Sequence, residues 1–132
     1  MVKTLIVEDN TAFRQSFREL LCTRFPSMVV GEAADGKEAL QKIDAIVPDI
    51  IFMDIKLPGQ NGLELTKRIR ANHPKILIVI LTSYDLPEYR QAADQCGANY
   101  FLPKSTSTEE VVELVQSILS ETGFDSDDRT RD

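Results

Sequence analysis

The sequence predicts an α/β protein, a doubly wound parallel sheet with helices on both faces. Two observations carry this prediction. Short apolar segments alternate along the chain with segments whose apolar residues recur at helical spacing. Several of the apolar segments are continuous instead of alternating with polar residues, which is typical of parallel strands buried on both faces. The length of 132 residues suits one such domain with one core.

Five apolar segments are expected to be strands. They cover residues 4–7, 27–31, 49–53, 76–81 and 99–102. The first, third and fourth segments contain unbroken apolar runs, whereas the second is the weakest of the set.

The segments between the strands carry the apolar stripes of amphipathic helices. The stripes are Phe13, Phe17, Leu20 and Leu21; Ala39, Leu40, Ile43 and Val47; Leu65 and Ile69; Leu86 to Cys96; and Val111, Val115, Ile118 and Leu119. Three pairs resemble capping boxes at helix starts, namely Asp35 with Glu38, Asp85 with Glu88, and Ser107 with Glu110.

Five repeats of strand then helix, joined by right-handed crossovers, build a parallel sheet covered on both faces. We expect the flavodoxin-like strand order 2-1-3-4-5, although the alternation alone does not determine the order. Residues 1–121 form the predicted domain. Residues 122–132 are rich in Asp and Arg, and they are expected to be a polar tail or linker stub.

The charge balance narrows the classes of function. With 21 acidic and 15 basic residues the net charge is −6, which argues against direct binding of nucleic acid. The longest apolar run, residues 76–81, is too short to span a membrane, and Met1 leads almost directly into the first strand. Cys22 and Cys96 fit reduced, partly buried thiols. A cytoplasmic location is therefore expected.

Polar side chains follow four of the predicted strands. They are Glu8 and Asp9, then Asp54, Thr82 and Lys104. Ligands of a doubly wound sheet bind at the carboxyl ends of its strands, so the expected strand order brings these residues together. Each pair of carboxylates at about 4 Å repels by roughly 4 kcal/mol at an effective dielectric constant near 20. A hard divalent cation such as Mg²⁺, or Mn²⁺, relieves that repulsion, and Lys104 offers further positive charge.

This set of residue types suits phosphoryl chemistry. A carboxylate can attack phosphorus to form an acyl phosphate, while a metal ion and a lysine stabilise the charge on the transferred group. The Thr82 hydroxyl can donate to a phosphate oxygen. Each residue alone has an ordinary explanation, because an acidic residue at a strand end is usually a helix cap or a turn residue. The prediction therefore depends on all of them occurring after the correct strands.

Four segments resemble the receiver domains of two-component response regulators, over residues 3–121. They are Leu5-Ile6-Val7-Glu8-Asp9-Asn10, Phe52-Met53-Asp54-Ile55-Lys56-Leu57-Pro58-Gly59, Ile80-Leu81-Thr82-Ser83 and Phe101-Leu102-Pro103-Lys104. The resemblance implies that Asp54 accepts a phosphoryl group from a histidine kinase or phosphotransfer protein. It implies that Glu8, Asp9, Asp54 and the backbone carbonyl of Lys56 bind Mg²⁺. Thr82 and Lys104 would engage the phosphoryl group.

The resemblance also implies a conformational switch. Phe101 matches the family's switch aromatic, and movement of Thr82 toward the phosphoryl group would vacate space for its ring. The surface formed by the fourth helix, fifth strand and fifth helix would then change shape. That surface, or the one formed by the first and fifth helices, is a candidate homodimer interface.

Four positions bear on how far the family's properties extend to this chain. Ser105 stands where many receivers have proline, so the isomer of the Lys104–Ser105 bond is left open. Glu8 replaces an aspartate and is expected to reach the metal through water. Lys56 and Tyr84 occupy positions that tune hydrolysis of the acyl phosphate, and their size and charge suggest a long-lived phosphoryl state.

Other functions fit the sequence less well. A haloacid-dehalogenase-type phosphatase would need an aspartate at position 56, and a flavodoxin would need a hydroxyl-rich loop after the first strand. A degenerate receiver would lack part of the site. We therefore expect a phosphoacceptor that catalyses its own phosphorylation and slow dephosphorylation, not an enzyme. Residues 31–36 and 104–105 resemble receivers that precede helix-turn-helix DNA-binding domains, and a stand-alone receiver in a phosphorelay also fits.

Overall fold

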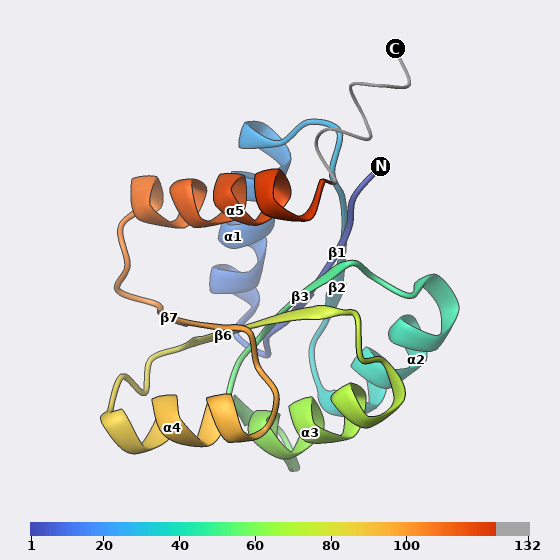
Figure 1. The fold of residues 1–132 in the computed structure, drawn as a ribbon, viewed down its shortest axis with the longest axis vertical. Helices are drawn as coiled ribbons and strands as arrows, with labels where there is room; N and C mark the ends of the chain where they lie inside the picture. The colour runs from blue at the N-terminus through green and yellow to red at the C-terminus, as the bar shows by residue number, and fades with distance from the viewer. Residues whose placement is uncertain (124–132) are drawn as a thin grey trace.

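The apolar segments of the chain form one parallel sheet. A computed structural model describes residues 1–123 of the chain (Figure 1). The strands of this sheet are β1 (Lys3–Val7), β2 (Val29–Ala33), β3 (Ile50–Met53), β6 (Leu77–Thr82) and β7 (Tyr100–Pro103). Their order is β2-β1-β3-β6-β7, all parallel, which confirms the predicted order. The numbering skips because two short strands, β4 (Lys56–Leu57) and β5 (Gln60–Asn61), form a separate antiparallel pair.

Helices cover both faces of the sheet. They are α1 (Thr11–Arg24), α2 (Gly36–Ile46), α3 (Gly62–Asn72), α4 (Pro87–Gln95) and α5 (Thr108–Thr122). Helices α1 and α5 lie on one face, and α2, α3 and α4 lie on the other (Figure 1). None of the helices within residues 1–123 has both the length and the apolar character needed to cross a bilayer. Most of the predicted polar tail, from residue 124 onward, lies outside the described residues.

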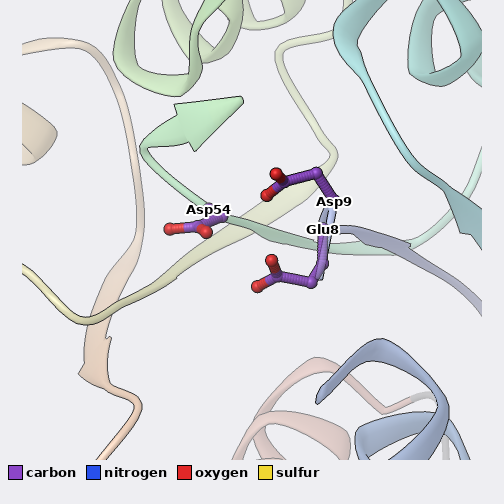
Figure 2. Close-up of side chains that lie close together, drawn as sticks. All are labelled: Glu8, Asp9 and Asp54. Carbon is purple, nitrogen blue, oxygen red and sulfur yellow. The ribbon is translucent and has the colours of Figure 1, made fainter. Parts of the chain in front are cut away.

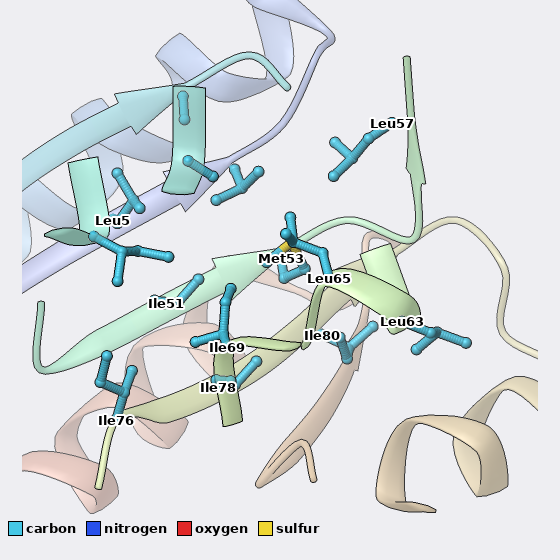
Figure 3. Packing of buried hydrophobic residues seen from close by; sticks show 14 of the residues in the cluster. Leu5, Ile51, Met53, Leu57, Leu63, Leu65, Ile69, Ile76, Ile78 and Ile80 are labelled. Atoms are coloured by element: carbon cyan, nitrogen blue, oxygen red, sulfur yellow. The ribbon is translucent and has the colours of Figure 1, made fainter. Parts of the chain in front are cut away.

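The core has two layers because side chains alternate between the faces of each buried strand. On β3, Ile51 and Met53 face α2, α3 and α4, whereas Ile50 and Phe52 face α1 and α5. Figure 3 shows the first of these layers, in which helix residues such as Leu65 pack against the strands. Full burial of a Leu, Ile or Phe side chain contributes about 1.5–3 kcal/mol. The continuous apolar runs of the sequence are thus explained by burial on both faces.

Two helix starts were predicted correctly and one was wrong. Asp35 and Ser107 are N-caps, and each side chain accepts a hydrogen bond from the backbone N–H three residues later. Asp85 does not cap α4. That helix starts one residue later, with Leu86 as an N-cap that makes no side-chain hydrogen bond. Asp85 instead forms an ion pair with Arg90 at 2.9 Å, so its carboxylate serves a side chain and not the helix backbone.

Two further boundaries differ from the prediction. Strand β2 is displaced by two residues toward the C-terminus and includes Glu32. This charged residue is accommodated because β2 is an edge strand and because Arg14 and Arg18 of α1 pair with the carboxylate. Val47 was expected on the buried stripe of the second helix, but it is 49% exposed and ends α2 in the left-handed conformation (φ 44°).

Candidate functional site

The predicted site residues Glu8 and Asp54 lie side by side at the carboxyl ends of β1 and β3. The register pairs Val7 with Met53, the last residues of these strands. The chain then continues into Glu8 and Asp54, and the Asp54 N–H still donates to the Val7 carbonyl at 3.1 Å. The parallel ladder therefore sets the spacing of the two carboxylates.

Three carboxylates converge at this edge (Figure 2). One carboxylate oxygen from each of Glu8, Asp9 and Asp54 lies within 4.8 Å of the other two. Glu8 and Asp54 are 2% and 6% exposed, whereas Asp9 is exposed to solvent. Oxygen donors of this type and charge are the ligands that Mg²⁺ and Mn²⁺ prefer. The residues present therefore fit a hard divalent cation that reaches the site from the Asp9 side.

Lys104 joins two of the carboxylates. Its ammonium lies 2.5 Å from Glu8 Oε1 and 3.2 Å from Asp54 Oδ2. The side chain comes from the residue after β7, and its backbone N–H donates to the Thr82 carbonyl at 2.8 Å. One ammonium against three carboxylates leaves an excess of negative charge, which a divalent cation would balance.

The pKa values of Glu8 and Lys104 are shifted by burial and by the charges around them. Burial raises the pKa of Glu8, and the charge of Asp54 adds to the shift, while hydrogen bonds from Lys104 and the Asn10 N–H oppose it. Burial alone would lower the pKa of Lys104. The hydrogen bond to Glu8 and the nearby negative charges outweigh burial, so the pKa of Lys104 is raised and its ammonium stays charged.

Asp54 is also held from the side of α3. Its Oδ1 accepts a hydrogen bond from the Ile55 N–H at 2.8 Å. Gly62, the first residue of α3, packs so closely that an added Cβ would lie 1.9 Å from the Asp54 carbonyl oxygen. Sequence reasoning did not select Gly62. The available signal was a glycine directly after the N-cap Asn61, in the segment that returns to the site after Asp54.

Thr82 and Phe101 lie on the neighbouring strands β6 and β7. Thr82 is fully buried, and its hydroxyl accepts a hydrogen bond from the Tyr84 N–H at 3.3 Å. Phe101 pairs in register with Ile80 and is partly buried. The guanidinium of Arg90 lies over its ring, 4.7 Å from the centroid. The two residues predicted to form the switch thus belong to adjacent strands.

Lys56 and Tyr84 lie together next to the site. The ammonium of Lys56 is 5.3 Å from the centre of the Tyr84 ring, which also contacts the ring of Tyr89. The Lys56 backbone belongs to β4, whose antiparallel pairing with β5 fixes the turn after Asp54. The Lys104–Ser105 bond, left open by the sequence, is trans.

The comparisons with known proteins agree with this fold. Residues 4–116 match the family model of the response regulator receiver domain, and the chain belongs to that family. Response regulators of this kind act in two-component signalling, and their receiver domains interact with histidine kinases.

Among curated relatives, the response regulator GacA of Pseudomonas syringae is 31% identical over 91% of this chain and 56% of its own length. The transcriptional regulatory protein YdfI of Bacillus subtilis is 38% identical over 83% of this chain and 51% of its own length. The chain thus spans about half the length of the curated relatives it matches.

The chain also aligns with solved structures of similar fold. A two-component response regulator of the LuxR family from Aurantimonas aligns with a TM-score of 0.84 and 32% identity, over 92% of this chain and 86% of that one. The chemotaxis protein CheY4 of Vibrio cholerae aligns with a TM-score of 0.82 and 31% identity, over 90% of this chain and 99% of that one.

Proposed function

We propose that Asp54 is the phosphoacceptor of a signalling switch and receives its phosphoryl group from a histidine kinase or a phosphotransfer protein. The observation that supports this most strongly is the contact of Lys104 with both Glu8 and Asp54, at an edge where Asp9 completes a carboxylate cluster. A structural salt bridge needs only one carboxylate. A site for a divalent cation and a phosphoryl group needs all three and the lysine.

The chain's own residues suit the transfer step. A carboxylate oxygen of Asp54 forms a bond to phosphorus as the bond between phosphorus and the donor's nitrogen breaks. The Lys104 ammonium, already within hydrogen-bond distance of Asp54, stabilises charge on the transferred oxygens. Glu8, Asp9, Asp54 and the Lys56 carbonyl would hold Mg²⁺ or Mn²⁺, which when bound neutralises charge on the phosphoryl oxygens.

We propose that the same site operates a conformational switch. The phosphoryl group adds negative charge and acceptor oxygens that attract the Thr82 hydroxyl. Inward movement of Thr82 leaves a space for the ring of Phe101, which would change the surface formed by α4, β7 and α5. We propose this surface, or the α1–α5 surface, as the site of dimerisation after phosphorylation.

Acetyl phosphate with Mg²⁺ provides a direct test, read by the intact mass of the protein. We expect one phosphoryl group on the wild-type chain and none on Asp54→Asn. Asp44→Asn, which removes an exposed aspartate from α2, is the matched control and should be phosphorylated like the wild type. Absence of any mass increase on the wild type would refute the phosphoacceptor proposal.

We further propose that the phosphoryl state is long-lived. The contact between Lys56 and Tyr84 supports this, because the two side chains would shield Asp54 from attacking water. The half-life of the phosphorylated chain should shorten in Lys56→Ala and in Tyr84→Ala, whereas Lys37→Ala in α2 should leave it unchanged. A half-life of seconds in the wild type would contradict the proposal.

The output of the switch is proposed from the relatives. Because the chain spans about half of regulators such as YdfI, we propose that it controls transcription through a DNA-binding domain following residues 122–132, which would serve as the linker. A stand-alone receiver in a phosphorelay is the alternative, and the length of the natural gene product separates the two. The free thiols of Cys22 and Cys96 are compatible with the cytoplasmic location we propose.

A further inference from the structure

We infer that Arg14 is a positioning residue for the carboxylate site and holds the loop that carries Glu8 and Asp9. This inference deepens the proposed function and rests on it. Arg14 lies in the first turn of α1, and neither charge patterning nor the receiver resemblance singled it out.

The guanidinium of Arg14 bridges two elements. Its Nη1 donates to the backbone carbonyl of Glu8 at 2.6 Å, and its Nε donates to the Glu32 carboxylate at 3.0 Å. The Arg14 side chain is 15% exposed, so solvent competes little with these bonds. Glu32 is itself held by Arg18 at 3.3 Å, and the Lys42 ammonium donates to the Glu32 carbonyl. Arg14 is therefore anchored at the end of β2 while it binds the loop after β1.

The loop from Glu8 to Asn10 is held through the backbone N–H and carbonyl groups of Glu8 and of Asn10. The Glu8 N–H donates to the Ala33 carbonyl, and the Asn10 N–H donates to the Glu8 carboxylate. The Asn10 carbonyl accepts a hydrogen bond from the Arg14 backbone N–H, and the Asn10 side chain caps α1. The Glu8 carbonyl lies at the point where the chain leaves the sheet, and Arg14 supplies its donor.

The direction of the Asp9 side chain depends on this loop. Asp9 is exposed, so packing does not fix its carboxylate, and the peptide that joins it to Glu8 is the one whose carbonyl Arg14 binds. Loss of the Arg14 bond lets this peptide rotate, which moves the Asp9 carboxylate relative to Glu8 and Asp54. Groups that orient metal ligands without touching the metal have large effects on affinity, because misplaced ligands bind a small cation poorly.

The bridging role requires arginine. A guanidinium presents Nε and Nη1 in fixed directions, so one side chain serves the Glu32 carboxylate and the Glu8 carbonyl together. A lysine in the same place has one ammonium on a flexible stem, and its strong attraction to Glu32 would leave the Glu8 carbonyl poorly served.

Titration of Mg²⁺ into the metal-free chain, followed by the amide NMR signals of Asp9 and Asp54, tests the inference. We expect Arg14→Met to weaken Mg²⁺ binding roughly tenfold, the scale found for residues that orient metal ligands. Arg14→Lys should lie between this variant and the wild type. Arg18→Met is the matched control, because Arg18 also pairs with Glu32 and, within the described residues, has no hydrogen bond or ion pair to Glu8. It should bind Mg²⁺ like the wild type.

A second readout separates positioning from a purely structural role. In the absence of metal, the Asp9 amide signal should shift in Arg14→Met and stay in place in Arg18→Met. Unchanged Mg²⁺ affinity in Arg14→Met, with lowered thermal stability, would overturn the inference and leave the proposed function intact. If Arg14→Met does not fold, the affinity of Arg14→Lys decides, and a value equal to wild type overturns the inference. If the wild-type chain binds no Mg²⁺ at this site, the proposed function and the inference both fail.

Discussion

The loops after β1, β3 and β6 all begin at the same edge of the sheet, yet they are held very differently. The first two carry the carboxylates and are fixed by hydrogen bonds from Arg14, Asn10 and Ile55. The loop after β6 exposes Tyr84 and Leu86 and leads into α4. That helix has nine residues, no side-chain N-cap and only one fully buried residue.

The other helices differ from α4 in a consistent way. Each of α1, α2, α3 and α5 starts with a side chain that accepts a hydrogen bond from its first turn. Such a cap stabilises a helix by about 1 kcal/mol. Few buried contacts and a missing cap are features of segments that open at low free-energy cost. The loops that carry the carboxylates are thus fixed by several hydrogen bonds, whereas the loop after β6 and helix α4 are held more weakly.

Substitution of Gly62 should have the largest effect on stability and on phosphorylation. In Gly62→Ala the new methyl group would meet the Asp54 carbonyl at 1.9 Å, so either α3 or Asp54 must move. We expect a loss of about 3 kcal/mol in the free energy of unfolding, the upper part of the usual range for overpacking. Phosphorylation by acetyl phosphate should fall with it. Urea unfolding and intact mass measure the two effects.

Gly31→Ala is the control for that experiment. A methyl group there would lie 3.6 Å or more from its neighbours, which is an ordinary contact distance. Its phosphorylation should match the wild type. Equal behaviour of the two alanine variants would show that the close approach of α3 to Asp54 is not needed.

Arg70 connects α3 to the turn before β7, and its loss should have an intermediate effect on stability. Its guanidinium donates to the Gly97 carbonyl at 3.0 Å and to Asn99 Oδ1 at 2.8 Å, which joins α3 to the turn between α4 and β7. Arg70→Met should lower the free energy of unfolding by about 2 kcal/mol, as expected for lost charge-assisted hydrogen bonds. Arg68→Met, at an exposed position of the same helix, should have almost no effect in the same urea titration. A similar loss in both variants would contradict the role of these bonds.

A new cap on α4 should have the smallest effect of these substitutions. Leu86 has the extended conformation of an N-cap, and Pro87 already occupies the first helical position. Leu86→Ser should stabilise α4 by about 1 kcal/mol relative to Leu86→Ala, because only serine accepts a hydrogen bond from the first turn. Amide hydrogen exchange in α4 should slow accordingly. Exchange in wild-type α4 as slow as in α1 would contradict the inference that α4 is held more weakly than the other helices.

The sequence predicted some parts of the fold better than others. The buried strands were clear because both of their faces are apolar, as in residues 76–81. The edge strand β2 was misplaced because Glu32 looks like a loop residue until Arg14 and Arg18 are brought beside it. The start of α4 was misplaced because Asp85 and Glu88 have capping-box spacing, yet Arg90 takes the Asp85 carboxylate. In each case a distant or neighbouring side chain competed with the local pattern.

By itself, the sequence determined that this chain forms a parallel sheet and that acidic residues end two of its strands, since both follow from local periodicity and composition. The expected strand order already placed Glu8, Asp9, Asp54 and Lys104 at one edge of the sheet. Only the tertiary structure shows that an oxygen from each of the three carboxylates lies within 4.8 Å of the others and that Lys104 binds two of them. The same holds for the closeness of Gly62 to Asp54 and for the bond from Arg14 to Glu8. These contacts join residues through the register of strands and the packing of helices, and no local pattern in the sequence records that geometry.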